Sequence, residues 1–148
     1  MIPESAGPLV VRLVDSSVVV KWVLEETGRD HSLALLEAWE LRETRLVAPR
    51  VLREEVANAL SKRSRRKQLA QAQAERAFRF IEQRMPLLVH DANLVREALA
   101  LSLRHQLSLW DCLYLALAIR YRCDLVTADQ RLHRAVKPHY PFVVLLGV

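Results

Sequence analysis

The sequence of 148 residues contains little cysteine, glycine or proline, with 2, 3 and 6 of these residues respectively. Cys112 and Cys123 are too few for a disulfide framework, so we expect free thiols in a reducing cytosol. The low glycine and proline contents exclude a collagen-like or low-complexity chain. No apolar run approaches the roughly 18 residues of a membrane-spanning helix, and residues 1–11 lack the regions of a secretory signal. We therefore expect a cytoplasmic protein with no membrane span.

The chain is rich in apolar residues instead, at 51%, beside 26% charged residues. This balance is typical of a globular protein, and the length is that of one ordinary domain. No linker or internal repeat divides the sequence, so we expect a single domain over residues 1–148. The formal net charge of +5 permits a polyanionic partner but does not require one.

Short apolar segments alternate with helical segments along the chain. Strands are predicted at residues 10–14, 45–49, 87–90, 124–127 and 142–146. Helices are predicted at residues 18–24, 29–42, 50–65, 68–84, 91–105, 109–122 and 129–136. This alternation is typical of a parallel sheet covered by helices on both faces. The sequence therefore predicts the α/β class.

Four acidic residues are predicted to lie at one edge of this sheet. Asp15 ends the first strand, and Asp129 lies just beyond the fourth. Asp111 begins the helix that runs back before the fourth strand, and Glu55 lies in the first turns of the helix after the second. Ligands of open parallel sheets bind at the carboxyl ends of the strands, so these side chains are expected to meet there. Asp124 precedes its strand and is expected at the opposite edge.

Glu55, and not its neighbour Glu54, is the candidate on its helix. At about 100° per residue, Glu55 falls within the apolar arc of that helix, whereas Glu54 points away from it. A glutamate that faces the protein needs a partner, and pairing with Arg53 or Arg131 is a structural alternative to a role in a site.

The three aspartates also have structural explanations. Asp15 precedes two serines and could cap a helix, and Asp129 could do the same after the fourth strand. Ser108 and Asp111 have the spacing of a capping box, in which an acid is favoured in the first helical turn. Capping, however, does not require all of these acids to lie at the same edge of the sheet.

Four carboxylates at one edge repel one another unless a cation or protons neutralise them. Oxygen ligands without a cysteine and histidine cluster suit Mg²⁺ or Mn²⁺ better than Zn²⁺. Such a site can bind phosphate oxygens and activate a water, so the expected chemistry is hydrolysis of a phosphodiester. Thr127 and Ser16 could orient a ligand or simply cap helices. Asp91 is a possible accessory acid, although it is also the expected N-cap of its helix.

At these residues the sequence resembles the PIN-domain family, and within it the ribonuclease toxins of VapBC-type toxin–antitoxin pairs. Residues 13–26, LVDSSVVVKWVLEE, resemble the first motif of the family, whose acid falls on Asp15. Residues 48–60, APRVLREEVANAL, resemble the second motif, whose glutamate and asparagine fall on Glu55 and Asn58.

The resemblance continues in residues 107–132, LSLWDCLYLALAIRYRCDLVTADQRL, which are similar to the third and fourth motifs together. The third acid falls on Asp111, and the Thr-x-Asp signature falls on Thr127 and Asp129. Trp110 departs from the family pattern, in which a tyrosine or another residue is common at this position, but the acid that follows it is retained. The resemblance covers nearly the whole chain, with the motifs in the family's order and spacing.

This resemblance implies a three-layer α/β/α sandwich with a central parallel sheet of about five strands. It also implies a Mg²⁺- or Mn²⁺-dependent endoribonuclease, the toxin of a type II toxin–antitoxin system, which cleaves RNA with a metal-activated water. The implied partners are the RNA substrate, a cognate antitoxin and a second copy of the chain in a homodimer. The implied catalytic and metal-binding residues are Asp15, Glu55, Asp111 and Asp129, with Thr127, Ser16 and Asn58 as accessory residues.

Basic residues follow Glu55 along the chain and are candidates for RNA contacts. The segment KRSRRKQ, residues 62–68, holds five basic residues, and such a run can follow an RNA backbone or simply be a solvated helix end. The candidate RNA-binding residues are Arg50, Arg53, Lys62, Arg63, Arg65 and Arg66. Trp22, Trp39 and Trp110 are expected in the core or at an interface and not as stacking platforms for bases.

Two other functions are compatible with the sequence. One is a Mg²⁺ phosphohydrolase acting on a small substrate, and the other is a PIN-like module that binds RNA or a protein without cutting. The absence of an Asp-x-Asp motif after the first strand and of a glycine-rich phosphate loop disfavours the first. The presence of all four acids disfavours the second.

Overall fold

A five-stranded sheet forms the centre of the molecule in the computed structural model, which describes residues 9–147. The first eight residues, which include most of the segment considered above for a secretory signal, lie outside the described residues. The strands are β1 (Val10–Val14), β2 (Thr44–Pro49), β3 (Leu87–Val89), β4 (Asp124–Thr127) and β5 (Val143–Leu145). The helices are α1 (Ser16–Val19), which continues as the 3-10 turn η1 (Val20–Trp22), α2 (Arg29–Glu40), α3 (Leu52–Arg65), α4 (Gln71–Glu82), α5 (Ala92–His105), α6 (Leu109–Tyr121) and α7 (Gln130–Val136).

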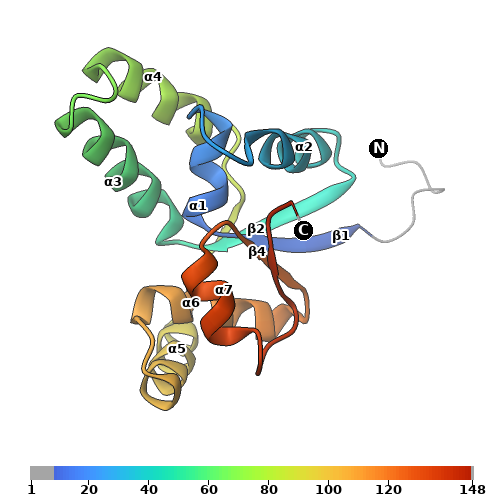
Figure 1. Ribbon diagram of the computed structural model, residues 1–148. Helices are drawn as coiled ribbons and strands as arrows, with labels where there is room; N and C mark the ends of the chain where they lie inside the picture. Colours follow the sequence, from blue (N-terminus) through green and yellow to red (C-terminus); the bar gives the residue numbers. More distant parts are fainter. Residues whose placement is uncertain (1–8, 148) are drawn as a thin grey trace.

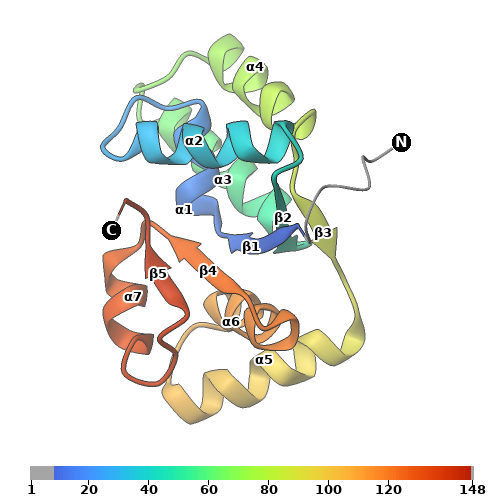
Figure 2. The ribbon, with the colours of Figure 1, turned by 90° about the vertical axis from the view of Figure 1, so that its right-hand side faces the viewer.

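The strand order is β3-β2-β1-β4-β5, and every neighbouring pair is parallel. Helices α1 to α4 cover one face of the sheet, and α5 to α7 cover the other (Figures 1 and 2). The predicted α/β/α sandwich with about five parallel strands is therefore confirmed. Apart from the first helix, no predicted bound differs from the observed one by more than three residues.

The first helical segment departs most from its prediction, which placed one helix over residues 18–24. The helix begins earlier, at Ser16, because the carboxylate of Asp15 accepts a hydrogen bond from the backbone N–H of Val18 and so caps it. It is only one turn long before it tightens into the 3-10 turn η1. Asp15 is thereby held at the junction of strand and helix.

Helix α6 is the central helix of the core. Its residues from Cys112 to Ala118 are all buried, because α6 lies between the sheet and α5 and contacts β1, β2 and β4. An apolar sequence without an amphipathic pattern is what such a helix needs. The same rigid helix carries Asp111 in its first turn, so the core fixes where this acid lies.

The cysteines, the tryptophans and the absence of a membrane span are the other expectations from the sequence. Cys112 and Cys123 are free, as predicted. Trp22 is buried and donates from Nε1 to the carbonyl of Ser32, whereas Trp110 is 56% exposed and is not part of the core. No helix in the described part of the chain is long and apolar enough to cross a membrane.

Candidate active site

The candidate site lies where β1 and β4 run side by side. The chain leaves β1 over one face of the sheet and returns to β4 over the other, so the strand order reverses between these two strands. In open parallel sheets, such a point opens a crevice at the carboxyl ends of the strands. The register pairs Val14 with Val126, and it therefore places Asp15 beside Thr127 at this end.

Asp15 is the most buried of the candidate acids, with 7% of its surface exposed. Its carboxylate accepts hydrogen bonds from the hydroxyls of Ser17 and Thr127 and from the backbone N–H of Val18. Burial raises the pKa of Asp15 from 3.8 to about 6, even though these hydrogen bonds favour the charged form. The nearby charge of Asp129 raises the pKa of Asp15 further.

The same hydroxyls tie Asp129 to Asp15. The backbone N–H of Asp129 donates to Oγ1 of Thr127 over 3.1 Å, and the N–H of Ala128 donates to Oγ of Ser17 over 2.9 Å. Asp129 also caps α7, because its carboxylate accepts from the N–H groups of Arg131 and Leu132. Both roles considered for Asp129 are thus compatible, and the cap fixes its position.

Ser17 is a site residue that sequence reasoning missed. The prediction chose Thr127 and Ser16 as accessory hydroxyls; Thr127 does contact Asp15, but the serine that does so is Ser17. Among the described residues, Ser16 makes no side-chain hydrogen bond. The two serines cannot be ranked from sequence, because the choice depends on how the chain turns from β1 into α1.

Glu55 reaches the site from α3 and meets Tyr114 of α6. The hydroxyl of Tyr114 donates to Oε1 of Glu55 over 2.6 Å. Glu55 is half-buried and Glu54 is exposed, as the apolar arc predicted. Sequence reasoning missed Tyr114, although it lies three residues after Asp111 and therefore on the same side of α6.

The charges of the four acids act on one another at this edge of the sheet. Burial is the main cause of the raised pKa of Asp15, Glu55 and Asp111, and the neighbouring acids add to it. Asp129 acts on Asp15 and Asp111, while Asp15 and Asp111 act on Glu55. The positive charge of Arg131 lowers the pKa of Asp111 and so offsets part of this rise. The four acids thus meet at one edge.

Two other acids lie away from this site. Asp124 is exposed and begins β4, opposite Arg12, so it is at the amino edge as predicted. Asp91 caps α5 and pairs with Arg120 near the end of α6. Arg120 lies nine residues beyond Asp111, or about 14 Å along the helix. Asp91 is therefore a cap and an ion-pair partner, and the position of α5 removes it from the acidic cluster.

The predicted basic residues fall into two groups. Arg53 pairs with Glu82 of α4 and lies over the ring of Phe78, so it does not pair with Glu55. Arg63 pairs with Glu26 over 2.5 Å. The other candidates are exposed and form no ion pair among the described residues; they are Arg50, Lys62, Arg65 and Arg66. Asn58 is also exposed, on α3.

The four acids fit a divalent cation in their chemistry. In the part of the chain that the structure describes, no three acidic, histidine or cysteine side chains form a group that could hold a metal ion as they are placed. The donors are nevertheless all oxygens, which Mg²⁺ and Mn²⁺ prefer. Burial and repulsion between neighbouring acids disfavour the charged forms of Asp15, Glu55 and Asp111, and a bound cation would remove that cost. Binding one ion therefore requires these side chains to move closer together.

A Tyr114→Phe variant tests how Glu55 is kept ionised. Because the hydroxyl of Tyr114 lowers the pKa of Glu55, its removal is expected to raise that pKa further above 4.5. The measurement is a carboxyl ¹³C NMR titration of Glu55. Tyr121→Phe on the same helix is the control, because Tyr121 is exposed. An unchanged or lower pKa of Glu55 in Tyr114→Phe would contradict the role given to this hydrogen bond.

The fold and the acidic crevice together define a class of parallel α/β proteins with a carboxylate cluster at the strand switch point. Comparison with known families makes this specific: the PIN domain model matches residues 12–138. The chain therefore belongs to the PIN domain family.

Three known proteins are similar to the chain. It is 33% identical over 126 residues to Ribonuclease VapC3 of Pyrobaculum aerophilum, an alignment that covers 81% of this chain and 90% of that protein. The crystal structure of PAE2754 from Pyrobaculum aerophilum superposes with a TM-score of 0.70 at 21% identity, covering 94% and 92% of the two chains. A chain of a toxin-antitoxin complex from Klebsiella pneumoniae superposes with a TM-score of 0.61 at 21% identity, covering 90% and 95%.

Proposed function

We propose that the protein is a Mg²⁺- or Mn²⁺-dependent endoribonuclease and the toxin of a type II toxin–antitoxin system. The observation that carries this proposal is the position of four acids, from four separate segments, at one edge of the sheet beside the strand switch point. Ribonuclease VapC3, a relative that aligns over most of the chain, supports the choice of RNA as substrate. We also propose that residues 1–148 form one domain and act in the cytoplasm, where the free thiols Cys112 and Cys123 would stay reduced.

The proposed metal-binding and catalytic residues are Asp15, Glu55, Asp111 and Asp129. When bound, a divalent cation would neutralise phosphate charge and lower the pKa of a water molecule. The chain's own contribution is to hold the carboxylates in place and charged. Thr127 and Ser17 do this for Asp15, and Tyr114 does it for Glu55. Ser16 and Asn58 remain proposed accessory residues.

The decisive experiment is an RNA cleavage assay with purified protein. The substrates are structured RNAs with single-stranded loops, because such loops expose their bases to proteins. Wild type is expected to cut with Mg²⁺ or Mn²⁺ and to stop when EDTA is added. Asp129→Asn is expected to be inactive, while Asp124→Asn, the same change at the opposite edge of β4, is expected to keep wild-type activity.

The two alternatives give different results in this assay. A non-cutting module would bind RNA and leave it intact at every metal concentration. A small-substrate phosphohydrolase would leave RNA intact and release phosphate from small phosphate esters, and Asp129→Asn would lose that activity. Either result overturns the ribonuclease proposal.

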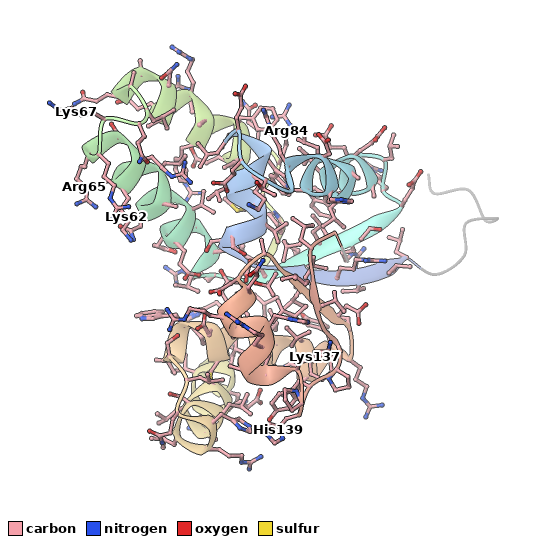
Figure 3. All side chains as sticks on the ribbon, viewed as in Figure 1. Lys62, Arg65, Lys67, Arg84, Lys137 and His139 are labelled. Carbon is pink, nitrogen blue, oxygen red and sulfur yellow. The ribbon has the colours of Figure 1, made fainter. Side chains whose placement is uncertain are left out.

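The proposed RNA contacts follow the exposed cations at the far end of α3. Lys62 and Arg65 point outward there, and Lys67 follows them at the turn into α4 (Figure 3). Lys62, Arg65 and Arg66 are exposed, while Arg63 is paired with Glu26. We propose that the exposed residues contact the phosphates of RNA that extends beyond the acidic cluster, and that Arg50 does so nearer the acids.

Changing Lys62, Arg65 and Arg66 together to glutamine is expected to raise KM for long RNA and leave kcat unchanged. Losing three phosphate contacts should lower the slope of log KM against log salt concentration by about 2. The measurement is cleavage kinetics over a range of salt concentrations. The charge-matched control changes Arg42, Arg45 and Lys137, which are exposed on other parts of the molecule. An equal slope in both triple variants would contradict the proposed contact.

A cognate antitoxin and a homodimer complete the proposed assembly. The toxin-antitoxin complex from Klebsiella pneumoniae supports the antitoxin, since one of its chains has this fold. An arginine of the antitoxin would suit the carboxylates, because guanidinium groups bind carboxylates in a bidentate way. The exposed side chains of Val95, Leu99 and Leu103 form an apolar stripe on α5 that supports self-association. Co-purification with the product of a neighbouring gene and sedimentation of the purified protein test these two proposals.

A further inference from the structure

A pocket of about 330 Å³ opens beside the acidic cluster, on the side of α7. Asp111 and Asp129 contribute to its lining, so it is continuous with the proposed active site. The rest of the lining comes from residues that have no role so far. This volume lies at the lower end of the range for small-molecule pockets, and it suits one nucleotide better than a larger ligand.

Two arginines of α7 line this pocket. Arg131 and Arg134 are three residues apart, so they project from the same side of the helix. Both are exposed, and neither forms an ion pair within residues 9–147. Two unpaired guanidinium groups beside one pocket are suited to a phosphate group, which they can bind through paired N–H donors.

The remaining lining is apolar and comes from Leu107, Leu132 and Ala135. A free anion gains nothing from contact with apolar side chains. A nucleobase, in contrast, presents a flat face that packs against aliphatic side chains and arginine planes. The combination of guanidinium and apolar groups therefore favours a phosphate joined to a base.

We propose that this pocket binds the nucleotide next to the scissile phosphate, with its phosphate on Arg131 and Arg134. Its base packs against Leu107, Leu132 and Ala135. The assignment to the neighbour of the scissile phosphate rests on the proposed ribonuclease function. It makes α7 a determinant of which base is accepted beside the cut, in addition to its role in holding Asp129.

The test is a titration of ¹⁵N-labelled protein with single nucleotides, followed by NMR. AMP, GMP, CMP and UMP are added one at a time, with EDTA and then with Mg²⁺, and inorganic phosphate is the comparison ligand. At least one nucleotide is expected to shift the amide signals of residues 107 and 130–136 at lower concentration than phosphate does. Changing Arg131 and Arg134 together to glutamine is expected to weaken nucleotide binding about tenfold.

A second variant separates the apolar part of the pocket from its charge. Ala135→Trp is expected to fill the space taken by the base, weakening nucleotide binding about tenfold while phosphate binding is unchanged. Lys137→Gln is the control, because it removes an exposed cation that follows α7 and does not line the pocket. In RNA cleavage, both pocket variants are expected to raise KM and alter the preference for the base beside the cut.

Three outcomes would overturn the pocket assignment. These are equal affinity for phosphate and all four nucleotides, signal shifts that map elsewhere, and nucleotide binding that is indifferent to the pocket variants. Cleavage of RNA by wild type together with any of them would leave the ribonuclease proposal standing. Nucleotide binding in the pocket of a protein that cuts no RNA would instead overturn the ribonuclease proposal and keep the binding site.

Discussion

Asp15→Asn is expected to reduce RNA cleavage about a thousandfold while making the folded protein more stable. The loss of activity follows from the central position of Asp15 in the acidic cluster, where it is the most buried of the four acids. An amide cannot supply the negative charge that a divalent cation needs. The gain in stability follows from the cost of keeping this carboxylate charged inside the protein.

The pKa of Asp15 gives the sign of the stability effect. Because the pKa of about 6 in the fold lies above the ordinary value of 3.8, protonation of Asp15 stabilises the fold. This contribution is complete below about pH 4 and is lost as the pH rises through 6. At neutral pH the charged carboxylate then costs at most about 3 kcal/mol.

The asparagine side chain can keep most of the hydrogen bonds of Asp15. Its oxygen can accept from Ser17 and Val18, and its amide can donate to Oγ1 of Thr127. Weaker neutral hydrogen bonds offset part of the gain, so we expect a net increase of about 1–2 kcal/mol at pH 7.5. The pKa of Glu55 should also fall, because Asp15 raises it in the wild type.

Chemical denaturation at pH 4.5, 6 and 7.5 measures this effect. The difference between Asp15→Asn and wild type should be largest at pH 7.5 and small at pH 4.5. Mg²⁺ should raise the Tm of wild type more than that of the variant, since a ligand stabilises the form that binds it. Asp124→Asn, a change at an exposed position of the neighbouring strand β4, should alter neither the stability at pH 7.5 nor the effect of Mg²⁺ on Tm. An Asp15→Asn variant that cuts RNA normally, or that is less stable at pH 7.5, would contradict the proposed role.

Much of the fold and the position of the acids could be predicted from the sequence. Alternating apolar and helical segments gave the parallel sheet, because each strand must be covered on both faces. The direction of the strands then placed Asp15 and Asp129 at one edge and Asp124 at the other. Asp111 followed from the direction of its helix, and Glu55 from the apolar arc around it. These inferences depend on local periodicity and strand direction, which the sequence contains.

What could not be predicted depends on contacts between distant segments. Ser17 contacts Asp15 because of the turn into α1, and Tyr114 contacts Glu55 because α6 lies beside α3. Asp91 lies outside the site because α5 begins near the end of α6, where Arg120 pairs with Asp91. The arginines of the α7 pocket, Arg131 and Arg134, are far in sequence from the basic segment at residues 62–68. Each of these depends on helix packing, which periodicity does not determine.

Thr127→Val is expected to damage both stability and activity. Thr127 is fully buried, and its hydroxyl donates to Asp15 and accepts from the backbone N–H of Asp129. Valine has the same shape but removes this partner from both groups. The carboxylate of Asp15 keeps its hydrogen bonds from Ser17 and Val18, while the N–H of Asp129 loses its acceptor. These losses are expected to lower the free energy of unfolding by about 1–3 kcal/mol at pH 7.5.

The activity of Thr127→Val is expected to fall about a hundredfold, because a residue that orients a ligand of a cation acts on affinity and rate together. The missing hydrogen bond also raises the pKa of Asp15 further, so protonation should recover part of the lost stability as the pH falls. Thr127→Ser, which keeps the hydroxyl and loses a methyl group, is the control for packing. If Thr127→Ser loses as much activity as Thr127→Val, the effect lies in the methyl group and the hydroxyl does not hold Asp15 and Asp129 in their catalytic positions.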